Sequence, residues 1–376
     1  MTSAIPKVHK AAVFSGSDVD GKICEIIETK TLQPSRNMLL VKINSIALNP
    51  IDWKRNNVWG GKGNIIGTDA SGEVVAVGDG VTGFKPGDSV SSFAHGGYKE
   101  DPTRGVFQEY AIVDPCLTIK YHEKLINSDS LNGPAKITTY EGAASINLAL
   151  VTVGLSMYNS FNASYDKSNQ AGKYLLVWGG ATTTGFIAIQ VARKIFGLRV
   201  LAVASKKHHE VLQSVGAEAC FDYHDEDVIA KIVAHGGDNI VYGYDTVSSD
   251  ETLNSTYKCL STKKPAICEN LLNKDESNIL EENRRENVTV THTLSFLAGG
   301  ETLHLGGITI KPPPDLAEKH LEYWNIIQKY IVDGTIKHAP LKVLPNGLNS
   351  VDVGLSLLRN NKVSLEKLIA RVADTK

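Results

Sequence analysis

The chain is 376 residues long, a length that predicts two domains. Its hydrophobic content of 42% and its charged content of 21% are those of an ordinary soluble globular protein. A formal net charge of −2 gives no electrostatic basis for binding nucleic acid or an anionic membrane, so neither is expected as a partner. No apolar run is long enough to cross a bilayer. Residues 1–10 carry neither a secretory signal nor a transit segment, which favours a cytoplasmic location, with the nucleus as a second option.

The first 120 residues alternate short strand-like runs with glycine turns, a pattern typical of a small, partly open β-barrel. Residues 135–165 are apolar and helical in character. From residue 173 to about residue 310, strands alternate with helices, which predicts a doubly wound parallel sheet. A helix at 316–331 and a strand at 363–371 then return to the first domain. We therefore expect an α/β chain with a discontinuous first domain, 1–160 plus 315–376, and an inserted domain at 161–314.

The five cysteines are scattered along the chain, and no pair has C-x-x-C spacing. Their spacing and odd number predict reduced thiols rather than a disulfide framework or a zinc cluster. Cys24 and Cys220 fall in strand-like runs and are expected to be small core residues.

A glycine-rich turn follows the apolar strand at 174–178. Two glycines allow a sharp turn and the close approach of a pyrophosphate, and a third lets the next helix pack near the sheet. The first-turn amide groups of that helix, with three threonine hydroxyls beside them, form an anion site. The spacing is not a clean G-x-G-x-x-G, and a turn without a ligand is the alternative. The predicted cofactor-binding residues here are Gly179, Gly180, Ala181, Thr182, Thr183, Thr184 and Gly185.

A second apolar strand, at 199–204, ends where an acidic residue would bind the ribose hydroxyls of NAD. The chain instead has Ser205, Lys206, Lys207 and His208 at this tip. Serine and lysine can bind a 2′-phosphate that a carboxylate would repel, so NADPH is the favoured cofactor and NADH the alternative. Tyr223, after the third strand, is expected to flank the same phosphate. A solvated basic helix start without a ligand is the competing interpretation.

Further segments in both predicted domains carry a resemblance to a known family: 49–54, 67–78, 84–90, 107–110, 179–185 and 362–367. On these segments the chain resembles the medium-chain dehydrogenase/reductase superfamily, in its zinc-free quinone and enoyl reductase branch. It is more narrowly similar to fungal trans-acting enoyl reductases and yeast aldehyde reductases of the furfural-reducing kind. The resemblance implies a GroES-like catalytic domain, an inserted Rossmann domain, and hydride transfer from nicotinamide in the cleft between them.

The chain departs from the zinc-containing members of that superfamily at their metal sites. They place a cysteine near the position of Asn49 and a histidine where this chain has Thr68, and they carry a lobe of four closely spaced cysteines. No cysteine lies between Val90 and Val113 here, so we expect no bound zinc. His95 is nearby, but a lone histidine in a glycine-rich loop is expected to be a surface residue.

The resemblance also implies candidate catalytic residues. Asn49 would donate an amide hydrogen bond to a substrate oxygen. Lys54 would stabilise developing charge or deliver a proton if burial lowers its pKa; the alternative is a surface lysine. Trp59 would line the pocket or pack in the core, and Ser156 matches a segment near the nicotinamide.

Further contacts follow from the same segments. Asp52, Trp53, Val363 and Ser364 are expected at the cofactor, although Asp52 could instead be a structural partner inside its motif. The tyrosine that many zinc-free relatives carry after the asparagine is missing, so a tyrosyl proton donor is in doubt. Tyr98 is a weaker candidate for a lid residue.

Losing zinc removes the Lewis acid that would stabilise an alkoxide. A conjugated acceptor needs this Lewis acid less. Hydride addition to such an acceptor gives a delocalised enolate, whose oxygen hydrogen-bond donors can hold. The sequence therefore leaves three hypotheses. The first is a monomeric or homodimeric reductase of small aldehydes, enones or quinones. The others are a trans-acting enoyl reductase for a carrier-bound chain and a non-enzymatic NADPH-binding factor.

Overall fold

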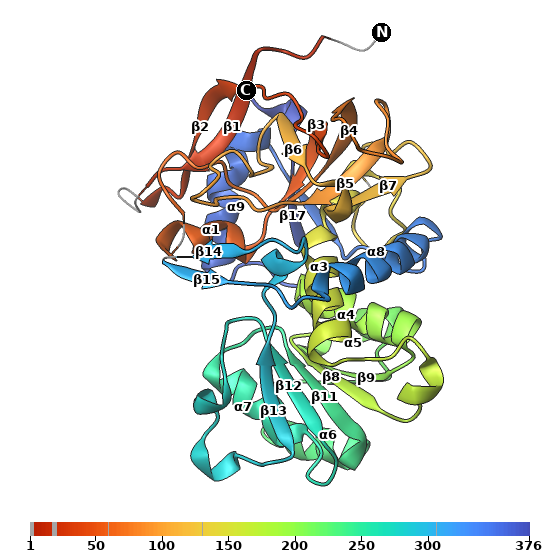
Figure 1. Cartoon of the computed structure of the whole chain (residues 1–376). Coiled ribbons are helices and arrows are strands. Elements are labelled where there is room, and N and C mark those ends of the chain that lie inside the picture. The colour runs from red at the N-terminus through yellow and green to blue at the C-terminus, as the bar shows by residue number, and fades with distance from the viewer. Residues whose placement is uncertain (1–3, 17–20, 59, 130, 306) are drawn as a thin grey trace.

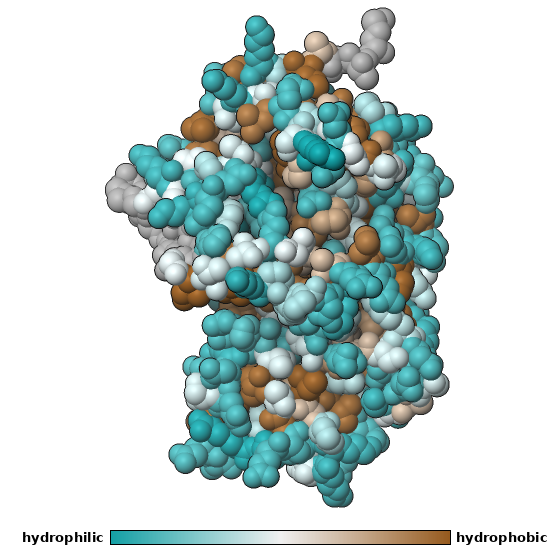
Figure 2. Space-filling model, in the orientation of Figure 1, coloured by the Kyte–Doolittle hydropathy of each residue, from teal (hydrophilic) through white to brown (hydrophobic). Residues whose placement is uncertain are grey.

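The computed structural model describes residues 4–16, 21–58, 60–129, 131–305 and 307–376. Figure 1 shows two halves stacked on one another, with the two ends of the chain in the same half. We call them the barrel half, formed by β1 to β7, β16, β17 and their helices, and the parallel-sheet half, formed by β8 to β13 and theirs. The face in Figure 2 is largely hydrophilic, and its outline narrows between the halves. Within the described residues, no helix is long and apolar enough to span a bilayer.

The barrel half contains a seven-stranded sheet in the order β16-β17-β3-β4-β5-β7, with β6 paired to β3. A separate hairpin, β1-β2, packs beside it. β17 runs antiparallel to β3, with Ile369 opposite Ala47, so the end of the chain returns to the first domain as predicted. The bounds are β1 (Val8–Phe14), β2 (Cys24–Lys30), β3 (Leu39–Ala47), β4 (Asp69–Val77), β5 (Ser89–Phe93), β6 (Tyr110–Val113), β7 (Thr118–Tyr121), β16 (Leu341–Leu344) and β17 (Lys367–Arg371).

The parallel-sheet half has six parallel strands in the order β10-β9-β8-β11-β12-β13. This is the doubly wound order, and ligands of such sheets bind where the order reverses, here beyond the ends of β8 and β11. β8 is buried along its whole length, as its continuous apolar sequence predicts. The bounds are β8 (Tyr174–Trp178), β9 (Arg199–Val203), β10 (Ala219–Phe221), β11 (Ile240–Asp245), β12 (Ala266–Asn270), β13 (Val288–His292), α4 (Thr183–Val191), α5 (His209–Val215), α6 (Val228–Gly236) and α7 (Asp250–Cys259).

The remaining helices connect the halves or cover the barrel. α3 packs against α4, and its last turn continues as a π-helical segment, η3 (Ser156–Ser160). One apolar core contains Leu150 of α3, Phe186 of α4 and Tyr323 of α8, so the two halves share a buried interface. The bounds are α1 (Pro50–Val58), α2 (Tyr140–Ala144), α3 (Asn147–Leu155), α8 (Leu316–Val332) and α9 (Val351–Arg359).

The chain returns to the barrel half soon after β13. A short turn, η10 (Ser295–Leu297), places the Phe296 ring 5.4 Å from the Phe93 ring. Glu301, a little further along the chain, forms an ion pair of 2.7 Å with Arg104 of the barrel half. A hairpin of β14 (Leu303–Leu305) and β15 (Ile308–Ile310) follows. The segment after residue 295 therefore contacts the barrel, although the predicted second domain extends to residue 314. The bounds 1–160, 161–314 and 315–376 stay a prediction.

One expectation about the barrel is wrong. His95 is 2% exposed rather than at the surface, because its ring packs against the rings of Phe93 and Phe296. The cysteines Cys24 and Cys220 lie in β2 and β10, buried and half-buried, as expected for small core residues.

Candidate active site

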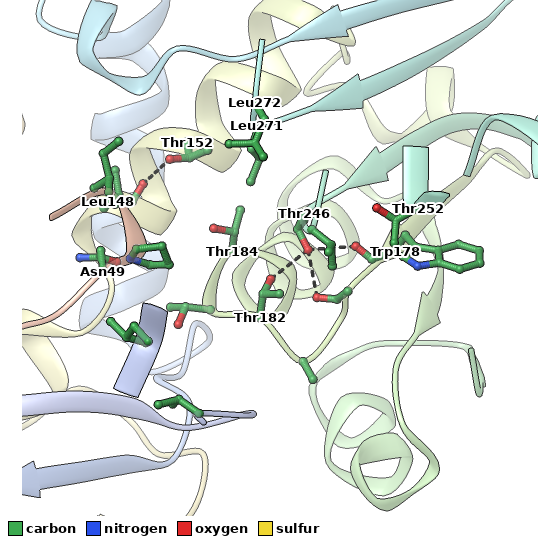
Figure 3. Close-up of a pocket in the computed structure, with 18 of the residues that line it drawn as sticks. Asn49, Leu148, Thr152, Trp178, Thr182, Thr184, Thr246, Thr252, Leu271 and Leu272 are labelled. Atoms are coloured by element: carbon green, nitrogen blue, oxygen red, sulfur yellow. Dashed lines mark hydrogen bonds between the residues drawn. The ribbon is translucent and has the colours of Figure 1, made fainter. Parts of the chain in front are cut away.

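A cavity of about 990 Å³ lies between the two halves. Its walls come from the start of α1 and the loop before β17 on the barrel side, from α3, and from the segments that follow β8, β9, β11, β12 and β13. Such a volume is at the upper end of the range for small-molecule sites. Figure 3 shows side chains of both halves facing this space, among them Asn49, Leu148, Thr182, Thr184 and Thr246.

The glycine turn after β8 has a geometry that excludes larger residues. Gly179 has φ of +86°, and a Cβ there would lie 2.6 Å from Thr246 Oγ1. A Cβ on Gly185 would lie 2.3 Å from the carbonyl oxygen of Gly179, so this glycine lets α4 pack close to the strand. Gly179 and Ala181 line the cavity, whereas Gly180 and Gly185 lie behind it.

Threonines hold the start of α4 in place. Thr182 caps the helix, because its Oγ1 accepts a 2.9 Å hydrogen bond from the Gly185 amide. Thr246 bonds to the same hydroxyl at 2.9 Å and lies 2.9 Å from the Trp178 carbonyl oxygen (Figure 3). First-turn amides have no acceptor inside their helix. The cavity-lining start of α4, at Thr183 and Thr184, therefore offers donors and a positive helix end to an anion.

At the tip of β9 the cavity is lined by Ser205, His208 and Tyr223. Ser205 Oγ donates to the Tyr223 hydroxyl at 2.9 Å. Lys206 and Lys207 are exposed and do not line the cavity. Sequence reasoning missed Asp222, whose carboxylate accepts a 3.1 Å hydrogen bond from the Lys206 amide.

The segment before β17 reaches this same end of the cavity. Val363 and Ser364 line it, and Ser364 Oγ lies 2.9 Å from His208 Nε2. The Leu365 amide donates to the Ala181 carbonyl at 3.2 Å. The structure therefore brings together three predicted cofactor segments that are far apart in the sequence. They are the glycine turn after β8, the tip of β9 where the ribose was expected, and the segment before β17.

Asn49 lines the barrel side of the cavity, but its side chain is already fully hydrogen-bonded. Its Nδ2 donates to Asp69 Oδ2 at 2.8 Å and to Thr68 Oγ1 at 3.1 Å, and its Oδ1 accepts from Lys367 Nζ. Because both amide hydrogens are used within the chain, this arrangement does not provide the free donor to substrate that the sequence analysis expected.

Lys367 is a functional candidate to which sequence reasoning gave no role, although it ends the segment 362–367 that carried the family resemblance. Its ammonium lies 3.4 Å from Asp69 Oδ2, and the two side chains are only 4% and 0% exposed. Burial lowers the pKa of Lys367 and raises the pKa of Asp69. The available signal was a lysine directly before the apolar run of β17 (Leu368 to Ala370). A buried cation therefore lies beside the two positions, Asn49 and Thr68, that hold zinc ligands in the zinc-containing relatives.

Asp52 does not line the cavity. Its carboxylate accepts from the Asn49 amide at 2.8 Å and from the Thr68 hydroxyl at 3.0 Å, and burial raises its pKa to about 7. It acts as the structural partner that the sequence analysis gave as the alternative to cofactor binding. Trp53 packs against the barrel core and does not line the cavity either.

Lys54 does line the cavity, and burial lowers its pKa. Trp59 lies outside the described residues.

Ser156 is fully buried and does not line the cavity. Its hydroxyl points instead to a buried cluster, 3.0 Å from the Tyr244 hydroxyl and 3.3 Å from Glu269 Oε1. Sequence reasoning missed Glu269, which is fully buried with a pKa raised to about 7 by burial. Tyr98 is buried, and its hydroxyl accepts from the His304 amide at 3.2 Å, so it does not face the cavity.

The residues on the barrel side do not fit a catalytic zinc. The two aligned ligand positions provide an amide and a hydroxyl, with an ammonium beside them, where zinc needs thiolate, imidazole or carboxylate ligands. In the described part of the chain, no group of three or more histidine, cysteine, aspartate or glutamate side chains is placed to hold a metal ion.

Comparison with known proteins agrees with the fold of both halves. Residues 35–123 match the family described as alcohol dehydrogenase GroES-like domain, and residues 183–264 match zinc-binding dehydrogenase. The protein YCR102C of Saccharomyces cerevisiae is 37% identical over 342 residues, which cover 88% of this chain and 92% of that protein. Trans-enoyl reductase resD of Aspergillus sclerotiorum is 30% identical over 351 residues, which cover 89% and 92%.

A solved structure shows the same fold. The quinone oxidoreductase from Coxiella burnetii aligns with a TM-score of 0.68 at 23% identity, over 97% of this chain and all of that one. The two family matches, the relatives that share most of their length with this chain, and the barrel joined to a doubly wound sheet lead to one conclusion: the chain belongs to the medium-chain dehydrogenase/reductase superfamily of oxidoreductases, and a trans-enoyl reductase is among its relatives.

Proposed function

We propose that this protein is a zinc-independent, NADPH-preferring reductase of small reactive carbonyl compounds, including aldehydes, enones and quinones. The observation that carries the proposal is the cavity itself. It joins the anion-binding start of α4 to a wall that holds Asn49 and Lys54. A dinucleotide and a small substrate can therefore share one space between the two halves.

The residues of the parallel-sheet half fit a dinucleotide. The start of α4 and the Gly179 turn would hold the pyrophosphate, since a side chain at Gly179 would fill the space beside Thr246. Ser205, His208 and Tyr223 would hold the ribose and its 2′-phosphate, and the exposed Lys206 and Lys207 could swing towards it. When bound, the nicotinamide supplies the hydride that reduces the substrate.

Charge on the barrel side supports the reduction of a carbonyl. Lys54 lines the cavity with an ammonium that burial makes easier to deprotonate, so it can stabilise a developing oxyanion or donate a proton. Lys367, which bonds to Asn49 and also lines the cavity, adds a second positive charge, partly neutralised by Asp69. Together they supply positive potential where the zinc-containing relatives place their metal.

The test is a panel of aldehydes, enones and quinones assayed by the oxidation of NADPH and NADH. We expect turnover with several small carbonyls and a higher kcat/KM for NADPH. Gly179→Ala should abolish cofactor binding, because its Cβ would collide with Thr246. Gly172→Ala is the matched control: its φ is +77°, but a Cβ there meets nothing within 4 Å. Tight NADPH binding without turnover across the panel would instead indicate a non-enzymatic NADPH-binding factor.

A second candidate is a trans-acting enoyl reductase. The 30% identity with trans-enoyl reductase resD over most of the chain favours it. The two functions differ in the acceptor, so the same enoyl group should be offered as a small free thioester and on a carrier protein. Reduction of the carrier-bound chain alone would replace our proposal with this one.

A further inference from the structure

Glu269 is a buried carboxylate in β12 that the chemistry above does not use. It is 0% exposed, and its hydrogen-bond partners are hydroxyl groups rather than a cation. A buried carboxylate normally needs a positive partner, because leaving water costs it several kcal/mol. Four hydroxyls replace that partner here, those of Ser156, Ser160, Thr291 and Thr293.

The two carboxylate oxygens have different surroundings. Oε2 accepts from Thr291. Oε1 accepts from Thr293 and lies 3.1 Å from Ser160 Oγ and 3.3 Å from Ser156 Oγ. Both serines come from the widened π-helical turn η3, and such turns are frequent at functional sites.

Only one of the two threonines of this cluster lines the cavity. Thr293, which follows β13, lines the cavity, as does Thr152 of α3. Thr291, within β13, does not line the cavity. Thr152 and Ser156 lie one turn apart, and Ser156 Oγ lies 3.1 Å from the Thr152 carbonyl oxygen. Thr293 therefore connects the buried carboxylate to the cavity, because its hydroxyl bonds to Glu269 and the residue lines the cavity.

We propose that Glu269 supplies the proton for carbonyl reduction, passing it through the Thr293 hydroxyl to the substrate oxygen. The proposal rests on the proposed function. As the substrate gains hydride, Thr293 gives its hydroxyl proton to the oxyanion and takes the carboxylic proton of Glu269. The product leaves as an alcohol or enol, and Glu269 remains a carboxylate. Water that enters the open cleft after release then returns a proton along the same path.

The titration of Glu269 suits this role. Burial raises its pKa to about 7, so a large share of the protein carries the proton near neutrality. Tyr244 of the neighbouring strand β11 faces Glu269, whereas Cys268, the preceding residue of β12, lies on the opposite face of the sheet. Burial raises the pKa of both well above neutrality, so both stay uncharged while Glu269 titrates. The groups that face it from η3 and from the end of β13 are hydroxyls.

The chain offers a matched pair of variants, since Thr291 and Thr293 each bond one oxygen of the same carboxylate. We expect Thr293→Val to lower single-turnover reduction at pH 7 by about a hundredfold, a typical contribution of positioned acid catalysis. Thr291→Val should keep the wild-type rate at pH values below the falling limb of the pH profile and should shift that limb to higher pH, because a donor to the charged form is lost. Thr293→Ser should restore the rate. Glu269→Gln should remove the falling limb.

Equal losses in Thr291→Val and Thr293→Val would overturn the proposal and make the cluster a structural clamp. A falling limb retained in Glu269→Gln would overturn it as well. An infrared carboxyl band that titrates near neutrality in wild type and is absent from Glu269→Gln would support it without turnover. If wild type reduces no carbonyl compound, the proposed function fails first, whereas normal turnover in Thr293→Val overturns the relay alone.

Discussion

The two walls of the cleft solve the same electrostatic problem in different ways. On the barrel side, the buried Asp69 carboxylate is 3.4 Å from the Lys367 ammonium. On the parallel-sheet side, Glu269 is equally buried but is held by hydroxyl groups. A charge pair is costly to break, because either partner alone is stranded in a low dielectric. A carboxylate held by hydroxyls can take up a proton with little rearrangement. The Asp69–Lys367 pair is therefore suited to constant charge and Glu269 to titration.

The largest expected effect comes from breaking the charge pair. Lys367→Met leaves Asp69 and Asp52 buried near each other without a cation, and we expect a loss of about 3–5 kcal/mol in the free energy of unfolding. Urea unfolding followed by circular dichroism measures it. Lys342→Met is the control, because Lys342 lies on the neighbouring strand β16 but is exposed. Adding Asp69→Asn to Lys367→Met should recover part of the loss. Equal stability of the two lysine variants would show that the pair contributes nothing.

The next effect concerns the lysine that faces the cavity. Lys54→Ala should lower turnover by about a hundredfold, or about 3 kcal/mol, while leaving NADPH affinity nearly unchanged. The loss should be larger for aldehydes than for quinones, since an alkoxide is localised and a quinone enolate is not. Single-turnover hydride transfer to both substrates is the measurement, with the exposed Lys62→Ala as control. Wild-type rates in Lys54→Ala would assign charge stabilisation to other groups.

A smaller effect should appear in the pH dependence of stability. The folded pKa of Glu269, about 7, is raised above the ordinary value of 4.5. The folded state therefore keeps a proton that the unfolded state releases, and stability falls as pH rises from about 4.5 to 7, by roughly 2–3 kcal/mol. Asp52 titrates in the same range, so the difference between wild type and Glu269→Gln isolates Glu269. Parallel curves of unfolding free energy against pH would contradict the assigned pKa.

The smallest effect lies at the exposed end of the cavity. Replacing Lys206 and Lys207 with alanine should weaken NADPH binding about five- to tenfold, because charge pairs exposed to solvent contribute little. NADH binding should change hardly at all. Fluorescence titration with both cofactors gives the two dissociation constants. Equal losses for both cofactors, or a wild-type preference for NADH, would mean that these lysines do not recognise the phosphate.

The sequence determined the architecture, because the signals for it are local. The apolar run of β8, the glycines of the turn and the alternating strand and helix patterns predicted the doubly wound sheet, and the structure confirms it. Gly179 and Gly185 were recognisable because backbone geometry limits which residues fit there. The family resemblance placed Asn49 and Lys54 at the cleft, where both lie.

Only the tertiary structure decided which polar groups meet. Lys367 bonds to Asn49 across most of the chain length, and Glu269 of β12 contacts Ser156 of η3, 113 residues away in the sequence. Helical periodicity does not say whether Ser156 faces the cavity or the core. A lysine or glutamate in an apolar strand likewise does not reveal its partner. Burial and hydrogen bonding set the charge of these groups, and both depend on long-range packing that no local pattern encodes.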